Sequence, residues 1–101
     1  METDARLAAE FLIIRDAAAD GRPVGPNTAG RVAFCGYGGQ VRGWIWNIAT
    51  LTERGWVAEA ATPTRGRHYV ATDLGRQVFS RLPEHAQQAA ERYQTSWHMW
   101  S

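Results

Sequence analysis

Residues 51–75 read LTERGWVAEAATPTRGRHYVATDLG, two apolar stretches separated by turn-forming residues. The segments 56–61 and 67–72 are rich in residues that favour strands, and each is short enough to be one strand of a hairpin. The residues between them include proline and glycine, which is typical of a hairpin tip. Gly55 directly before the first strand predicts the left-handed end of a helix. The stretch therefore predicts a helix end followed by a β-hairpin.

Helices are expected on both sides of this hairpin. Before it, apolar residues recur at helical spacing over 4–19 and over about 40–54, and a shorter helix is predicted from Asn27 or Thr28 to about residue 35. After it, Thr72 can cap a helix over 73–82, and Pro83 can begin a last helix that leads into an aromatic tail. The expected fold class is α+β, mainly α with a small β-hairpin.

Length and charge limit the organisation of the chain. Its 101 residues, 45% of them hydrophobic, correspond to one domain. We expect a single domain over 1–101, with a core at about 4–82 and a C-terminal helix and aromatic tail at 83–101. The formal net charge is only +1, but residues 36–82 hold six arginines against three acidic residues. An anionic partner is therefore expected to bind the middle of the chain.

Two motifs make the order of elements more specific. LTERGWV at 51–57 resembles the end of a recognition helix, and RHYVATDLG at 67–75 resembles the end of the wing in PadR-like and MarR-like regulators. Together they cover about residues 27–82 and resemble winged helix-turn-helix proteins. The resemblance implies a winged helix-turn-helix fold with an extra C-terminal helix. It also implies a sequence-specific regulator of transcription that binds double-stranded DNA.

The resemblance also implies which residues meet the DNA. The third predicted helix would enter the major groove, and the hairpin would contact the flanking backbone. Arginine suits both phosphates and guanine edges, and glutamine suits base edges. Because a protein on a promoter blocks polymerase, we expect a repressor. The expected contact residues are Thr28, Gln40, Arg42, Gly43, Trp46, Asn47, Arg65 and Arg67.

A second hypothesis is a winged-helix module that binds another protein, such as a phage- or plasmid-encoded inhibitor of a host factor. Trp46 lies roughly opposite the apolar stripe of its predicted helix, and tryptophan is enriched at the energetic centres of protein interfaces. The low net charge favours this hypothesis, whereas the arginines at the hairpin tip oppose it. A non-catalytic accessory subunit is a third possibility.

The chain has more tryptophan than its core requires, with five in all. The tail carries Trp97, Met99 and Trp100, and Ile13 falls outside the main stripe of the first helix. These residues either pack within one chain, tail against first helix, or form the interface of an isologous dimer. Because a chain this short is only modestly stable alone, we expect a homodimer.

Other kinds of site are not indicated. His68, His85, His98 and the single Cys35 lack the spacing of metal ligands, and no serine lies in a nucleophile motif. We therefore expect neither an enzyme nor a protein with a cofactor or metal. The acidic start lacks the pattern of a signal peptide, and no apolar run could span a bilayer. A cytoplasmic location without membrane partners is the expectation.

Overall fold

The computed structural model describes residues 2–19, 24–26, 32–34, 47–62 and 66–100, which form four helices and four strands. The expectation of a mainly α protein with a small β-hairpin is confirmed. In chain order the elements are α1 (Glu2–Ala19), β1 (Val24–Pro26), β2 (Val32–Phe34), α2 (Ile48–Glu53), β3 (Val57–Thr62), β4 (Gly66–Ala71), α3 (Asp73–Ser80) and α4 (Glu84–Trp100).

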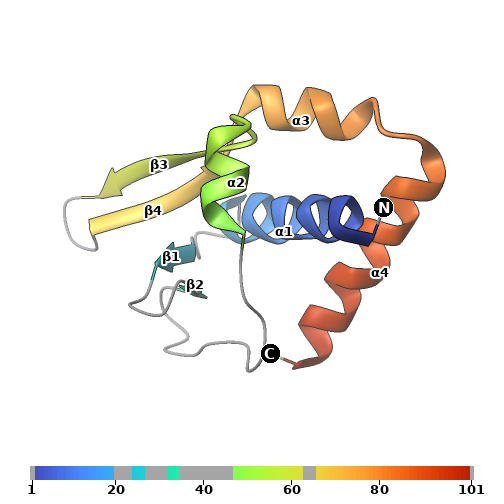
Figure 1. Cartoon of the computed structure of the whole chain (residues 1–101). Helices are drawn as coiled ribbons and strands as arrows, with labels where there is room; N and C mark the ends of the chain where they lie inside the picture. The colour runs from blue at the N-terminus through green and yellow to red at the C-terminus, as the bar shows by residue number, and fades with distance from the viewer. Residues whose placement is uncertain (1, 20–23, 27–31, 35–46, 63–65, 101) are drawn as a thin grey trace.

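Helix α1 runs through the middle of the molecule, and α4 and β4 pack against it (Figure 1). The predicted apolar stripe of Leu7, Phe11 and Ile14 is fully buried. Ile13, on another side of the helix, is also only 1% exposed in the single chain. A helix that is apolar on more than one face needs such enclosure. This corrects the expectation that Ile13 lies at a dimer interface, because its own chain already covers it.

The four strands form one antiparallel sheet in the order β2-β1-β4-β3. Strands β3 and β4 are the predicted hairpin, paired in register from Val57 opposite Ala71 to Thr62 opposite Gly66. Strand β1 joins this hairpin through Val24 opposite Tyr69. The sheet therefore has two strands that the sequence did not predict, both supplied by the segment after α1.

The helix predicted to end near residue 35 is wrong over Val32–Phe34, which is strand β2. These three residues pair antiparallel with β1, with Val24 opposite Phe34. Valine and phenylalanine favour strands. Where the local preference is weak, pairing with a neighbouring strand determines the secondary structure. The proposed cap of that helix, Asn27 or Thr28, lies outside the described residues.

The third predicted helix, expected over about 40–54, is confirmed at its carboxyl end, where α2 covers Ile48–Glu53. It does not continue through Asn47. Helix α2 begins at Ile48, and Asn47 is its N-cap with φ −99° and ψ 49°, so no helix runs through residue 47. Residues 40–46 lie outside the description. Leu51 is fully buried, as predicted. Gly55 has φ +77°, the left-handed conformation expected after this helix.

Helices α3 and α4 follow the hairpin as predicted. Thr72 caps α3, and α4 begins directly after Pro83. Helix α4 packs on α1, and Gln94 donates a hydrogen bond from Nε2 to Oδ2 of Asp16 at 2.6 Å. The last helix thus docks on the first within one chain. The side chains of Trp97, Met99 and Trp100 lie outside the description.

Within the described parts of the chain, no helix combines the length and the apolar character needed to cross a membrane.

Candidate nucleic-acid interface

The hairpin β3–β4 projects from one side of the helices, with its base beside α2 and α3 (Figure 1). The tip of the hairpin follows the pair Thr62–Gly66. Arg67 lies one pair closer to the base, opposite Ala61. Arg65 belongs to the tip residues 63–65, which are outside the description. The backbone register therefore places Arg67 near the free end of the hairpin.

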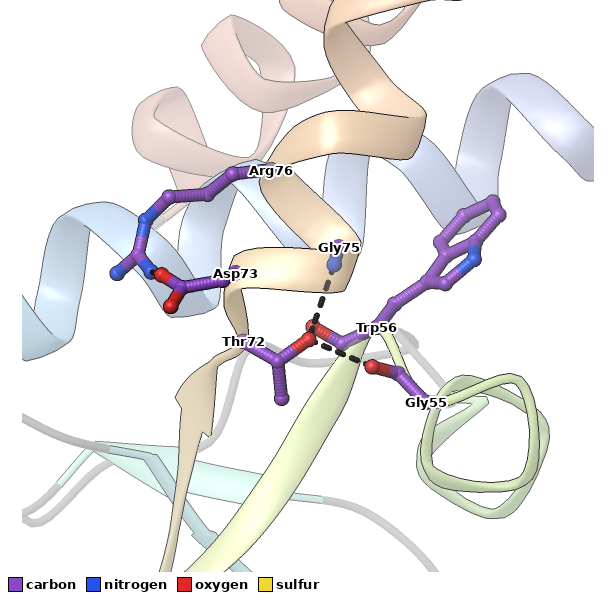
Figure 2. A network of polar contacts seen from close by, with 6 residues as sticks. All are labelled: Gly55, Trp56, Thr72, Asp73, Gly75 and Arg76. Carbon is purple, nitrogen blue, oxygen red and sulfur yellow. Dashed lines mark hydrogen bonds and ion pairs between the residues drawn. The ribbon is translucent and has the colours of Figure 1, made fainter.

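At its base the hairpin is held by the hydroxyl group of Thr72. Oγ1 lies within hydrogen-bond distance of two carbonyl oxygens, at 2.5 Å from that of Gly55 and at 3.0 Å from that of Trp56. The same oxygen accepts a hydrogen bond from the Gly75 N–H at 2.9 Å (Figure 2). The Thr72 N–H also donates to the Trp56 carbonyl at 3.0 Å. One threonine thus connects the end of β4, the start of β3 and the first turn of α3.

Gly75 allows α3 to approach the hairpin closely. A Cβ atom at this position would lie 2.6 Å from Cε1 of Phe11 and closer still to the carbonyl oxygen of Trp56. Real side chains do not tolerate such distances, so a larger residue would push α3 away. The Thr-x-x-Gly pattern at 72–75 therefore has two structural reasons. Thr72 caps α3, and Gly75 lets the backbone of α3 lie close to the base of the hairpin.

The turn between α2 and β3 is tightly bonded. The Gly55 N–H donates to the Thr52 carbonyl and the Trp56 N–H to the Leu51 carbonyl, both at 3.0 Å. The guanidinium of Arg54 lies over the Trp56 ring, 5.4 Å from its centroid, a cation–π contact. Helix α2 and the hairpin are therefore connected with little freedom between them.

Asn47, an expected DNA contact, instead bonds to the protein itself. Its backbone N–H donates to Oε1 of Glu10 at 2.8 Å, and its side-chain Nδ2 donates to Oε2 at 2.9 Å. Glu10 is fully buried in α1. The Asn47 amide nitrogen is thus engaged by a carboxylate, so we leave Asn47 out of the contact set proposed below.

The structure locates only part of the expected set. Asn47 stands at the start of α2 and Arg67 near the free end of the hairpin, so the described residues do not bring these two together. The remaining expected contacts lie outside the description: Thr28, Gln40, Arg42, Gly43, Trp46 and Arg65.

Two further arginines lie on the surface after the hairpin. Arg76 in α3 forms an ion pair with Asp73 at 3.0 Å, and both side chains are largely exposed. Arg81 is the exposed C-cap of α3. Exposed ion pairs contribute little to stability. Both guanidinium groups therefore lie on a surface where an anionic partner can reach them.

The sequence-based site missed Glu10. A signal was present, because Glu10 follows Leu7 by three positions and precedes Ile14 by four, which places a carboxylate on the apolar face of a helix. A charged group at such a position needs a partner inside the fold.

No group of three or more histidine, cysteine or acidic side chains that could hold a metal ion occurs among the described residues. The chain matches no protein-family model, no curated protein and no solved structure.

Proposed function

We propose that the chain is a winged-helix protein that binds double-stranded DNA in a sequence-specific way and regulates transcription, as a repressor. The observation that carries this proposal is the projecting β3–β4 hairpin. It follows α2 through the left-handed Gly55, is held at its base by Thr72, and has Arg67 near its free end. Strand β1 beside β4 widens the hairpin into a small sheet at the root of the wing.

Charge along the sequence supports the same part of the chain. Residues 36–82 contain six arginines against three acidic residues, and this region includes α2, the hairpin and α3. Arginine binds phosphate oxygens through a planar fork of N–H groups, so a hairpin tip with Arg65 and Arg67 suits a sugar–phosphate backbone.

In the proposed mode of binding, the wing lies along the backbone and the segment leading into α2 reads the major groove. Gln40 and Arg42 in that segment have the chemistry for base edges. Because Val32–Phe34 is a strand, the proposal rests on the wing and this segment and needs no helix at residues 32–34. A homodimer would present two such surfaces to two half-sites, and a cytoplasmic location follows from the role.

The experiment is fluorescence anisotropy with duplexes from the protein's own promoter and with random duplexes, across a salt series. Arg65 and Arg67, doubled in a dimer, give about four phosphate contacts and a log–log salt slope of roughly −4, and two copies of Arg42 would steepen it to at most roughly −5 where they also meet phosphates. Arg67→Ala should weaken binding to all sequences and make the slope shallower by about 2. Arg42→Ala should instead reduce discrimination by about 1–3 kcal/mol.

Arg92→Ala is the matched control, since it removes the same charge from an exposed position in α4, away from the hairpin. It should leave the salt slope nearly unchanged. Absence of binding to either duplex at low salt would end the regulator proposal.

A protein-binding module is the second candidate. Two observations favour it: the Asn47 amide is engaged by Glu10, and Leu74 is 51% exposed at the start of α3, beside the base of the hairpin. Leu74 adds apolar area to that surface, and protein–DNA interfaces are more polar than protein–protein interfaces. If no duplex binds, Trp46→Ala and Leu74→Ala are the first variants to compare in a search for a protein partner.

A further inference from the structure

The buried carboxylate of Glu10 is the least expected feature of the core. Glu10 is 0% exposed in the middle of α1, the helix that supplies most of the buried core among the described residues. Removing a carboxylate from water is costly unless hydrogen bonds replace its hydration. An apolar residue would fill the same space without that cost, so the carboxylate is expected to have a specific role in the arrangement of its partners.

Its described partner is Asn47, which lies 37 positions away in the chain. One oxygen accepts from the Asn47 backbone N–H and the other from the side-chain amide, at 2.8 and 2.9 Å. A carboxylate that accepts two bonds from one residue fixes both the position and the rotation of that residue. Asn47 is also the N-cap of α2, and its carbonyl accepts from the Leu51 N–H at 3.0 Å. Through Asn47, Glu10 therefore sets how α2 begins on α1.

The segment expected to read bases ends at this contact. Trp46 is covalently joined to Asn47, and Gln40 and Arg42 precede it by a few residues. Base discrimination needs side chains placed to within a fraction of an ångström, whereas phosphate attraction tolerates looser placement. An error in the position of Asn47 would therefore affect discrimination before it affects overall affinity.

We propose that Glu10 is a positioning residue for sequence recognition: its paired bonds to Asn47 fix how α2 begins on α1, so that discrimination between DNA sequences depends on a buried residue of α1 that touches no DNA. This inference rests on the proposed function.

An exchange of the two side chains tests it. Asn47→Asp places two carboxylates face to face and removes the amide donor, with little change of volume. Glu10→Gln removes the charge and sets two amides against each other. In the double variant E10Q/N47D, the side-chain oxygen at position 10 can accept from the backbone N–H of position 47, while the new amide at position 10 donates to the new carboxylate. Both bonds are thus restored at unchanged net charge, as a double-mutant cycle requires.

The measurements are the ratio of affinities for promoter and random duplexes, and amide hydrogen exchange of α2. Asn47→Asp should reduce the affinity ratio about tenfold, keep the salt-dependent binding to random duplex, and speed exchange at Leu51. The double variant should recover most of the affinity ratio and most of the protection of Leu51 from exchange. The matched control is Asp16→Asn, which weakens another polar contact of α1, the one to Gln94. It should lower stability and leave the ratio unchanged.

The outcomes separate the two proposals. If the wild-type protein binds neither duplex, the proposed function fails and this inference fails with it. If the wild-type protein discriminates and Asn47→Asp discriminates equally well, only the positioning role is overturned. If both single variants unfold, the double variant decides: a folded protein with the wild-type ratio supports the role, whereas a folded protein without discrimination, or an unfolded one, overturns it.

Discussion

Gly75 shows how a single missing methyl group sets the distance between α3 and the hairpin. Gly75→Ala should destabilise the protein by about 1–3 kcal/mol, because the new Cβ would overlap the Trp56 carbonyl and the Phe11 ring. Chemical denaturation followed by circular dichroism measures the effect. Gln77→Ala, an exposed change in the same helix, is the control and should stay within about 0.5 kcal/mol. Equal stability of both variants would contradict the close approach.

Leu51 is the buried anchor of α2, with no exposed surface. Leu51→Ala should cost roughly 2–5 kcal/mol, since it removes buried methyl groups and leaves a cavity. The neighbouring exposed Thr52→Ala is the matched control, and both are compared by thermal melting. A Leu51→Ala protein that melts like the control would show that α2 does not pack as described.

At the scale of residues, sequence reasoning succeeded where the cause is local. The left-handed Gly55, the capping Thr72 and the buried Leu51 each follow from their neighbours in the chain. It missed the bonds between Glu10 and Asn47, because they join positions 37 residues apart. The side chain of Asn47 suits both a groove contact and an intramolecular donor, and the sequence alone does not show the bond to Glu10.

At the scale of elements, the regular helices and the hairpin were predictable and the small strands were not. Residues 24–26 and 32–34 are three-residue strands, too short for alternation to be visible. Strand β2 pairs with β1, and β1 in turn pairs with β4, whose Tyr69 lies opposite Val24 far along the chain. A cap-like Asn27 or Thr28 before several apolar residues favoured a helix there, and pairing with β1 outweighed that preference over Val32–Phe34.

The docking of α4 on α1 includes a polar contact that can be tested alone. Gln94→Ala removes the hydrogen bond to the Asp16 carboxylate, and should cost about 1 kcal/mol because the site is only partly buried. Gln88→Ala is the control, since its side chain bonds only to the exposed Glu84 of the same helix among the bonds described. Urea unfolding that gives the same midpoint for both variants would mean that this contact does not stabilise the docking.

At the scale of the whole molecule, assembly is the property to measure. We propose that the homodimer forms through the tail with Trp97, Met99 and Trp100, since Ile13 is covered within its own chain. Sedimentation at high micromolar concentration should give a dimer, and deletion of residues 96–101 should weaken it while α-helical content is largely retained. A monomeric full-length protein would contradict this proposal.

The docking of the last helix on the first also has a consequence in time. The contact between Asp16 and Gln94 joins residues 78 positions apart. Ribosomes add roughly 5–20 residues per second, so α1 is made about 4–16 seconds before its partner helix exists. During that interval its apolar residues have no α4 to cover them, and they are exposed to chaperones and to other nascent chains. Chains that terminate near residue 90 lack much of this cover and should therefore aggregate more than the chain with all of α4.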